Sequence, residues 1–348
     1  MSIRLTWILV NVALNVFFLI VCPWMIGHGY SFVSHIYSRE FGIGYVFVCN
    51  LAASAVSIIM LFPEIFKVKI DFDKVLWKEM LFFGLPLMVA GFAGMINETF
   101  DRILLPMLIE NKADAIAQNG IYGACYKLSI VMTLFIQTFR YAAEPFFFNH
   151  ASKENPQKTY ADVTHWFVIV CSFIFLGVML YIDIVKLMIG EQFRSGLKVV
   201  PILLMANLCI GVYYNLSIWY KLTGKTRWGA YMSIFGAAVT LLFNFLLIPR
   251  MGYLGAAWTT LICYAAMMAS CYLIGQKHYP VPYEVGRFFL YTGLALALWQ
   301  ISAMIKSATG FEGLATYAVN TVILLIFPLA VWFFERGKIS YLRRSKGL

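Results

Sequence analysis

Long apolar runs repeat along the whole chain, and each is long enough to cross a lipid bilayer as a helix. About 20 consecutive apolar residues suffice for one crossing. The runs lack the alternation of polar and apolar residues that marks the strands of a barrel, so helices are expected. Ten runs qualify, at residues 5–26, 43–62, 79–108, 120–148, 161–182, 197–220, 228–248, 254–275, 286–306 and 314–334. The sequence therefore predicts an all-α, polytopic transmembrane helix bundle of about ten helices.

Composition excludes the alternative of a large soluble helical protein. Hydrophobic residues make up 61% of the chain and charged residues only 13%, against about 25% charged in an ordinary soluble domain. A soluble protein of this length has too much surface to cover with so few charges. The connections between the runs are short, so any chemistry is expected inside the bundle or at its mouths.

The distribution of basic residues predicts the topology. The formal net charge is +10, which in a soluble protein would suggest nucleic-acid binding. If the N-terminus is cytoplasmic, 17 of the 27 Lys and Arg residues fall on the cytoplasmic side and 7 on the other, with the remaining three inside helices. This bias follows the positive-inside rule. We therefore expect both termini in the cytoplasm and no nucleic-acid partner.

Two of the predicted helices carry ionisable groups well inside their spans. The charged residues are Glu98, Asp101 and Arg102 in 79–108, and Lys127, Arg140 and Glu144 in 120–148. A charge at the bilayer centre costs about 2.5–3.5 kcal/mol on insertion scales, so a fold keeps such groups only where they pair or face water. These six residues are therefore the candidates for a functional site.

Helical spacing indicates where these charges point. Glu98, Asp101 and Arg102 share one face, because residues three and four apart are neighbours on a helix. In the next predicted helix a continuous polar stripe is formed by Ser129, Thr133, Gln137, Arg140 and Glu144, while Lys127 falls on a different side. Two interpretations stay open. Either Glu98–Arg102 and Arg140–Glu144 are intrahelical salt bridges that hold helices together, or the charges line a hydrated, partly cationic cavity.

Other functional classes find little support. The five histidines are scattered without metal-ligand spacing, and no G-x-x-x-x-G-K-[ST] loop is present, so we expect no metal, no cofactor and no enzyme activity. The seven cysteines lie in or beside apolar runs and are expected to be small buried hydrophobes. Pro86 and Pro145, near the ends of the two charged helices, are candidate hinges or static kinks.

Several short motifs, in order along the chain, resemble successive helices of a known transporter family. They include Phe83-Gly84-Leu85-Pro86-Leu87, Asn97-Glu98, Asp101-Arg102-Ile103-Leu104-Leu105, Tyr126-Lys127-Leu128, Glu144-Pro145-Phe146-Phe147, Leu222-Thr223-Gly224-Lys225-Thr226, Ile248-Pro249-Arg250-Met251-Gly252 and Gly255-Ala256-Ala257. Together they resemble the bacterial polysaccharide (O-antigen type) flippases of the multidrug/oligosaccharidyl-lipid/polysaccharide exporter superfamily. The resemblance covers essentially the whole chain.

The resemblance implies two helical lobes around a central cavity that opens to either side of the bacterial inner membrane. The substrate would be an undecaprenyl-pyrophosphate-linked oligosaccharide for surface polysaccharide or lipopolysaccharide biosynthesis. The expected partners are this lipid-linked oligosaccharide, the lipid bilayer and other polysaccharide assembly proteins. Within that picture the residues expected to contact the pyrophosphate or the sugars are Arg102, Lys127, Arg140 and Gln137, and those expected to orient them or to sense a coupling cation are Glu98, Asp101 and Glu144.

The resemblance also implies a departure, because family members usually have 12 or 14 helices and this chain aligns from the fifth onward. We therefore expect residues 1–78 to be a remnant of the N-terminal lobe, 79–275 a six-helix C-terminal lobe, and 276–348 two extra helices with a basic cytoplasmic tail. The chain would be a truncated form that does not transport alone. Two alternatives remain open: a cation-coupled exporter of small molecules or drugs, and a non-transporting membrane fragment or assembly partner.

Overall fold

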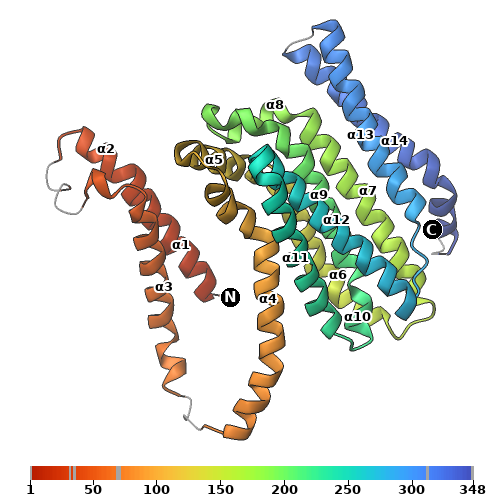
Figure 1. Ribbon diagram of the computed structural model, residues 1–348, viewed down its shortest axis with the longest axis horizontal. Helices are drawn as coiled ribbons and strands as arrows, with labels where there is room; N and C mark the ends of the chain where they lie inside the picture. Colours follow the sequence, from red (N-terminus) through yellow and green to blue (C-terminus); the bar gives the residue numbers. More distant parts are fainter. Residues whose placement is uncertain (1, 31–32, 34–36, 68–71, 311–312, 346–348) are drawn as a thin grey trace. The chain divides into compact units, whose positions relative to one another are not determined.

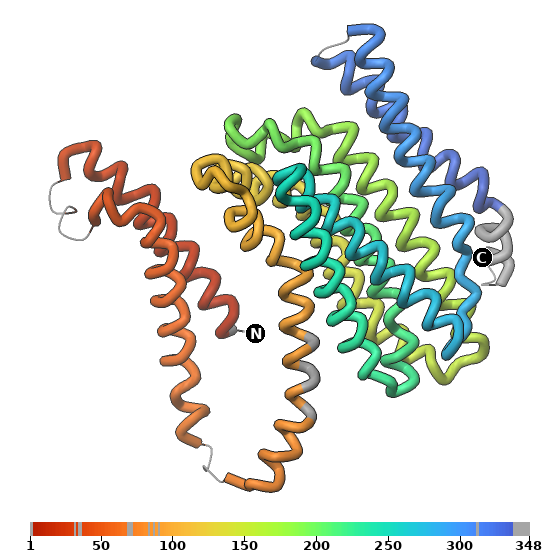
Figure 2. The backbone as a smooth tube through the Cα atoms, in the orientation of Figure 1, coloured from red at the N-terminus to blue at the C-terminus, as the bar shows by residue number. Residues whose placement is uncertain are grey.

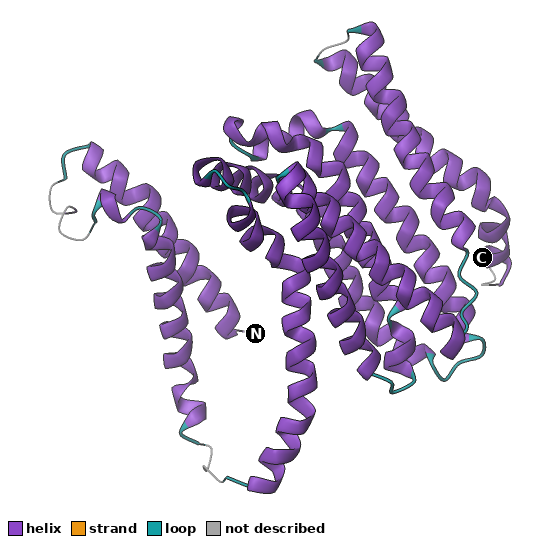
Figure 3. Cartoon of the chain, viewed as in Figure 1, coloured by secondary structure: helices purple, strands orange, loops and turns teal. Residues whose placement is uncertain are grey.

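The computed structural model describes residues 2–30, 33, 37–67, 72–310 and 313–345, and nearly all of them are helical (Figure 3). Side chains are described throughout except at 2, 83, 86, 87, 90 and 337–345. No strand occurs in these described segments. The prediction of an all-α fold is confirmed.

The helices alternate along the chain with short connections. In order they are α1 (Ser2–Val16), the π-helix η1 (Phe17–Val21), α2 (Cys22–Gly27), η3 (Arg39–Phe41), α3 (Gly44–Ile65), α4 (Lys74–Leu108), α5 (Lys112–Leu128), α6 (Ile130–His150), α7 (Pro156–Leu180), α8 (Ile182–Val185), η4 (Lys186–Met188), η5 (Glu191–Val199), α9 (Val200–Leu216), α10 (Ile218–Leu222), α11 (Arg227–Met251), α12 (Tyr253–His278), α13 (Val285–Thr309) and α14 (Leu314–Ser345).

Most of these helices are long and apolar enough to cross a membrane. Within the described segments, eight helical stretches meet this test, and α5 with α6 forms a ninth, bent candidate. The charged helix α4, which is 35 residues long, lies outside that set and corresponds to the third predicted run, 79–108. The protein is therefore a multi-pass membrane protein.

The chain divides into two compact units, Met1–Glu79 and Met80–Leu348. The first unit is a hairpin in which α1 packs against α3. An amide–amide hydrogen bond joins the two helices, from Asn11 Nδ2 to Asn50 Oδ1 at 2.5 Å, and Trp7 Nε1 donates to Ser54 Oγ at 3.4 Å. The predicted division of the rest of the chain at residue 276 stays a prediction. In the structure α13 and α14 both pack on α7 within the second unit.

The second unit is built around α12, which packs against both α9 and α11 (Figure 1). The tube in Figure 2 shows α11 and α12 running antiparallel through a tight turn. Gly252 forms this turn with a φ of 57°, a conformation that favours glycine. A Cβ at this position would also lie 2.1 Å from Gln118 Oε1 on α5. At the centre of the bundle, a Cβ on Gly211 of α9 would lie 2.6 Å from the Phe167 ring of α7, so glycine allows these helices to pack closely.

The predicted single helix at 120–148 is instead two helices, α5 and α6, that meet at an angle of 51°. Ser129 lies at the bend, is fully buried, and its Oγ donates to the carbonyl oxygen of Tyr126 at 2.7 Å. A serine hydroxyl that bonds to a nearby backbone carbonyl offers the chain an alternative to the regular helix ladder. The bend gives α6 its own direction, independent of α5.

Candidate functional site: a cationic cavity

A cavity of about 840 Å³ lies within the second unit, between α4, α5, α6, α9, α10, α11 and α12. Along α9 its lining extends from Asn207 to Ser217, which corresponds to about 15 Å at the helical rise of 1.5 Å per residue. Its size falls in the range of small-molecule binding sites, which is roughly 300–1,000 Å³.

Three cations from three different helices line this cavity. They are Arg140 on α6, Lys221 on α10 and Arg227 at the start of α11, and the lining contains one acid, Glu98 on α4. Lys221 forms an ion pair with Glu144, whereas Arg140 and Arg227 have no carboxylate within 4.0 Å among the described side chains. The cavity therefore presents a surplus of positive charge with hydrogen-bonding capacity left for a ligand.

Aromatic side chains form much of the remaining wall. Six tyrosines contribute, namely Tyr126, Tyr213, Tyr214, Tyr220, Tyr231 and Tyr264. The guanidinium carbon of Arg140 lies 4.9 Å from the centre of the Tyr214 ring, within cation–π range. Tyrosine combines an apolar ring face with a hydroxyl that donates and accepts hydrogen bonds. Such a wall suits a ligand that is both polar and ring-shaped.

The polar stripe predicted on 120–148 is partly present on α6. Thr133, Gln137 and Arg140 line the cavity. Glu144 lies in an adjoining recess of about 10 Å³, which Arg140 also lines, and its partner is Lys221 on α10. The other end of the predicted stripe, Ser129, lies buried at the α5–α6 bend.

The predicted acidic and basic group on α4 is divided by the structure. Glu98 lines the cavity, but Asp101 is buried and accepts hydrogen bonds from the Tyr122 hydroxyl and, at 2.7 Å, from the backbone N–H of Arg102. The Arg102 guanidinium carbon lies 4.1 Å from the centre of the Tyr126 ring. The Arg102 side chain therefore contacts a tyrosine of the cavity wall but is not itself part of the cavity lining.

Lys127 and Pro145 are not among the residues that line the cavity. The Lys127 side chain is exposed on α5. Pro145 is an exposed residue inside α6, whereas the side chain of Pro86 lies outside the described residues, although the backbone of α4 is helical on both sides of it. The roles of all three residues stay predictions.

The two intrahelical salt bridges of the first interpretation of the sequence do not form. Neither Glu98–Arg102 nor Arg140–Glu144 lies within 4.0 Å, since Glu144 pairs across to α10 and Arg102 stacks on Tyr126. Of the two interpretations of the sequence, the one with an open, partly cationic cavity agrees with this geometry.

Sequence reasoning missed Lys221 and Arg227 as members of the site. Both flank the α10–α11 connection, where their charges were counted as part of the cytoplasmic basic set. The predicted six charges sum to zero, and these two residues supply the cationic surplus. The available signal was the run Lys221-Leu222-Thr223-Gly224-Lys225-Thr226-Arg227, in which four cations or hydroxyls follow a helix end within reach of the bundle interior.

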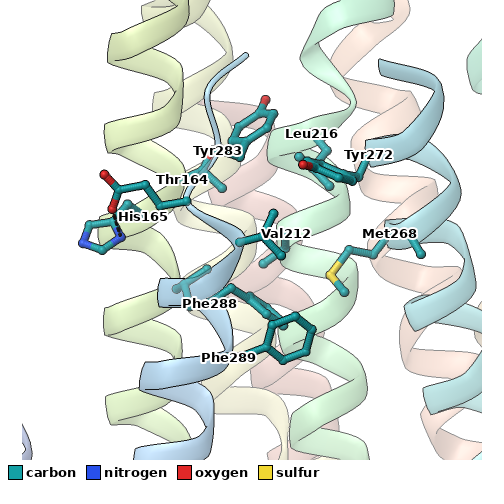
Figure 4. A pocket seen from close by; sticks show the side chains of 13 residues that line it. Thr164, His165, Val212, Leu216, Met268, Tyr272, Tyr283, Phe288 and Phe289 are labelled. Atoms are coloured by element: carbon teal, nitrogen blue, oxygen red, sulfur yellow. Dashed lines mark ion pairs between the residues drawn. The ribbon is translucent and has the colours of Figure 1, made fainter. Parts of the chain in front are cut away.

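A second, apolar pocket of about 180 Å³ is lined by residues of α7, α9, α12 and α13 (Figure 4). Val212 and Leu216 of α9 and Met268 of α12 line it, together with Phe288 and Phe289 of α13. At its rim His165 Nδ1 lies 3.8 Å from Glu284 Oε2. Its walls offer little to a charged ligand, so the two pockets differ sharply in chemistry.

Among the described residues, no group of three or more His, Cys, Asp or Glu side chains could hold a metal ion.

Comparison with known proteins agrees with the predicted resemblance. Residues 1–150 match the family model described as "Polysaccharide biosynthesis protein". No curated protein matches the chain. Among solved structures, the lipid II flippase MurJ in an inward closed conformation is similar, with a TM-score of 0.63 and 15% sequence identity. The match covers 87% of this chain and 64% of that chain, so this chain spans less than two thirds of the length of that flippase. At this identity the similarity shows the fold, which is MurJ-like, and the family match, which covers residues 1–150, agrees with the resemblance seen in the sequence.

Proposed function

We propose that this protein carries an undecaprenyl-pyrophosphate-linked oligosaccharide across the bacterial inner membrane for surface polysaccharide biosynthesis. The observation that carries this proposal is the surplus of cations in the cavity, where Arg140, Lys221 and Arg227 face a single lining acid. Arginine and lysine bind phosphate oxygens through charge-assisted hydrogen bonds, and arginine can do so with two parallel bonds. A pyrophosphate group would satisfy all three cations at once.

The position of the cavity supports entry from the cytoplasm. The lining includes α10 and the start of α11, which flank a connection that the positive-inside rule assigns to the cytoplasmic side. In this orientation both termini are cytoplasmic and the empty cavity is accessible to a substrate made inside the cell. The pyrophosphate would then meet Lys221 and Arg227 first, and Arg140 deeper along α6.

The remaining lining residues suit the sugar part of the substrate. The Gln137 amide can donate and accept hydrogen bonds with sugar hydroxyls, and the tyrosine rings offer flat apolar faces to sugar rings. We assign Glu98 to orienting the cations or sensing a coupling cation, since it is the lining acid. Asp101 and Arg102 support the wall from behind through Tyr122 and Tyr126.

A second function is favoured by one specific observation, the combination of Glu98 with tyrosine faces. A carboxylate beside aromatic rings also suits an organic cation, through charge and cation–π attraction. This combination supports the alternative function, a cation-coupled exporter of small molecules or drugs. The three lining cations oppose it, because they repel a positively charged ligand.

Binding of charged probes to the purified full chain in lipid nanodiscs tests both functions. We expect farnesyl pyrophosphate to bind, and Arg140→Ala and Arg227→Ala each to weaken that binding about 10- to 100-fold, because each removes a charged hydrogen-bond donor worth about 1.5–3 kcal/mol. The matched control is Lys225→Ala, which removes an exposed cation of the same connection that does not line the cavity.

The outcomes separate the candidates. Tight binding of tetraphenylphosphonium, lost in Glu98→Gln but unaffected in Arg140→Ala, would favour the small-molecule exporter. Equal binding of farnesyl pyrophosphate by wild type, Arg140→Ala and Arg227→Ala would remove the basis for the proposed function. Transport is then measured with the same variants in proteoliposomes, using a fluorescent short-chain pyrophosphate lipid and its accessibility to dithionite.

A further inference from the structure

The ion pair between Lys221 and Glu144 distinguishes Lys221 from the other cations of the cavity. Lys221 lines the cavity, and its ammonium reaches across from α10 to the Glu144 carboxylate on α6. Both side chains are partly exposed, at 30% and 39%. Arg140 lies beside this pair, because it lines both the main cavity and the recess that contains Glu144. One of the three cations that a phosphate would need is therefore already paired with a carboxylate.

The physical strength of this pair suits an interaction that is made and broken. Partly solvated ion pairs contribute little net free energy, because water screens the attraction and the long side chains lose freedom. A pyrophosphate carries more charge than one carboxylate and has several acceptor oxygens. It can therefore displace Glu144 from Lys221 while also contacting Arg140.

We propose that Glu144 is an internal counter-anion, which holds Lys221 in the empty cavity, is displaced by the anionic head group of the substrate, and by re-pairing with Lys221 promotes substrate release. This inference rests on the proposed function and adds to it a residue that sets affinity. Glu144 lowers affinity for the anion, so that binding stays reversible. In this it differs from the predicted role of orienting the cations.

The ion pair also links two helices, and substrate binding would break this link. Within the described residues, it is the one ion pair that joins α6 to α10. Pro145, the next residue on α6, lies inside the helix and cannot donate a backbone hydrogen bond to the preceding turn. Displacement of Glu144 therefore removes a side-chain link at a point where the helix ladder is already interrupted. Binding and movement of the α6 end become coupled.

The test measures the affinity of farnesyl pyrophosphate for the full chain in nanodiscs by calorimetry. We expect Glu144→Gln to bind the probe about 3- to 10-fold more tightly than wild type, because Lys221 no longer has to leave a carboxylate. Glu144→Asp, whose shorter acid cannot reach Lys221 in the same way, should shift affinity in the same direction and guards against poor folding of one variant. The matched control is Glu154→Gln, an exposed acid in the α6–α7 connection.

A double mutant isolates the mechanism. In a Lys221→Ala background, which itself weakens binding, Glu144→Gln should no longer tighten it. Unchanged or weaker binding in Glu144→Gln, with Lys221→Ala still weakening it, would overturn the counter-anion role and leave the proposed function standing. Failure of Arg140→Ala, Arg227→Ala and Lys221→Ala alike to weaken binding would overturn both. In proteoliposomes, tighter binding by Glu144→Gln should accompany slower turnover, whereas a purely structural pair would lower affinity and turnover together.

Discussion

Two groups of charged residues in the helices of the second unit, the cavity and a cluster around Glu335, differ in how their charges are paired. In the cavity Arg140 and Arg227 line an open space and have no carboxylate within 4.0 Å among the described side chains. Glu335 on α14 is 0% exposed. Its Oε1 is contacted by the Arg287 guanidinium and accepts from the Tyr291 hydroxyl at 2.5 Å.

Two further residues, His165 and Glu284, complete the cluster around Glu335. His165 Nε2 lies 3.0 Å from Glu335 Oε1, and Arg287 Nε lies 2.7 Å from Glu284 Oε2. The contacts of Glu335 join α14 to α7 and α13, whereas Glu284 and Arg287 pair at the start of α13 itself. Tyr291 is fully buried beside them.

The difference separates structural charge from charge available to a ligand. A buried ion costs several kcal/mol to desolvate, and its partners repay that cost only when the geometry is satisfied within the protein. In the Glu335 cluster one carboxylate oxygen, Oε1, is held by Arg287, Tyr291 and His165, whereas Oε2 is buried without a hydrogen-bond partner. The charge of Glu335 is thus paired within the protein. The cavity leaves cations with open space in front of them, and that is the arrangement a phosphate can use.

Glu335→Ala is the substitution with the largest expected effect. It leaves Arg287 and His165 without their buried partner, and breaking a buried pair in this way costs about 3–5 kcal/mol. We expect a large drop in the thermal unfolding temperature of the detergent-solubilised protein, followed by tryptophan fluorescence. Arg140→Ala should unfold much closer to wild type, because it removes a contact with the Tyr214 ring but no carboxylate partner.

Glu284→Ala serves as the control within the same cluster, since Glu284 is about one-third exposed and its loss should cost much less. If Glu335→Ala unfolded like wild type and instead lost farnesyl pyrophosphate binding, the division between structural and ligand-binding charge would be wrong.

Arg102→Ala has a smaller expected effect and tests the border between the two kinds of charge. Arg102 stacks on Tyr126 behind the cavity wall, so its loss should remove a cation–π contact worth about 0.5–2 kcal/mol and loosen the tyrosine. We expect a moderate fall in stability together with only a severalfold loss of probe affinity, measured as above. Arg102→Lys keeps the charge but not the planar stacking.

If charge alone matters at this position, Arg102→Lys will restore affinity fully. A loss of affinity in Arg102→Ala as large as that in Arg140→Ala, without any change in stability, would instead place Arg102 in direct contact with the ligand.

The fold could be predicted from the sequence because bilayer thickness sets the length of each apolar run. All ten predicted runs correspond to helices, and the polar positions Glu98, Gln137 and Arg140 reach the cavity as their spacing suggests. Helix spacing gives the face on which a residue lies but does not identify its partner on another helix. For this reason the sequence offered Arg140, four residues away, as a possible partner of Glu144 and did not identify Lys221.

Residues at helix ends were the least predictable. Lys221 and Arg227 were counted with the connections, and the last predicted run, 314–334, stops one residue before Glu335. His165 lies near the start of the predicted run 161–182, and the structure buries it in α7. Whether such a residue turns into the bundle or out to water depends on how neighbouring helices pack, and no local pattern records that.

The smallest expected effect concerns Asp183 of α8, at the opposite end of α13 from Glu335. Asp183 contacts Lys186 at 2.5 Å and Lys306 of α13 at 2.8 Å. The hydrogen bond from Lys186, and then that from Lys306, lowers the pKa of Asp183 below its ordinary value. The pairs are partly exposed, so they contribute less than about 1 kcal/mol.

Because the pKa of Asp183 is lowered on folding, its contribution is complete above the ordinary aspartate pKa of about 3.9 and is lost as the pH falls through the lowered value. Asp183→Asn should therefore unfold slightly below wild type at pH 7, and the difference between them should shrink as the pH drops below about 4. Glu191→Gln, whose acid is 86% exposed in its pair with Arg194, should show no such difference at either pH. A gap between Asp183→Asn and wild type that stayed constant down to pH 3 would mean that shape, not charge, joins α8 to α13. That outcome would weaken the contrast with the Glu335 cluster, where charge is the expected basis of the attachment.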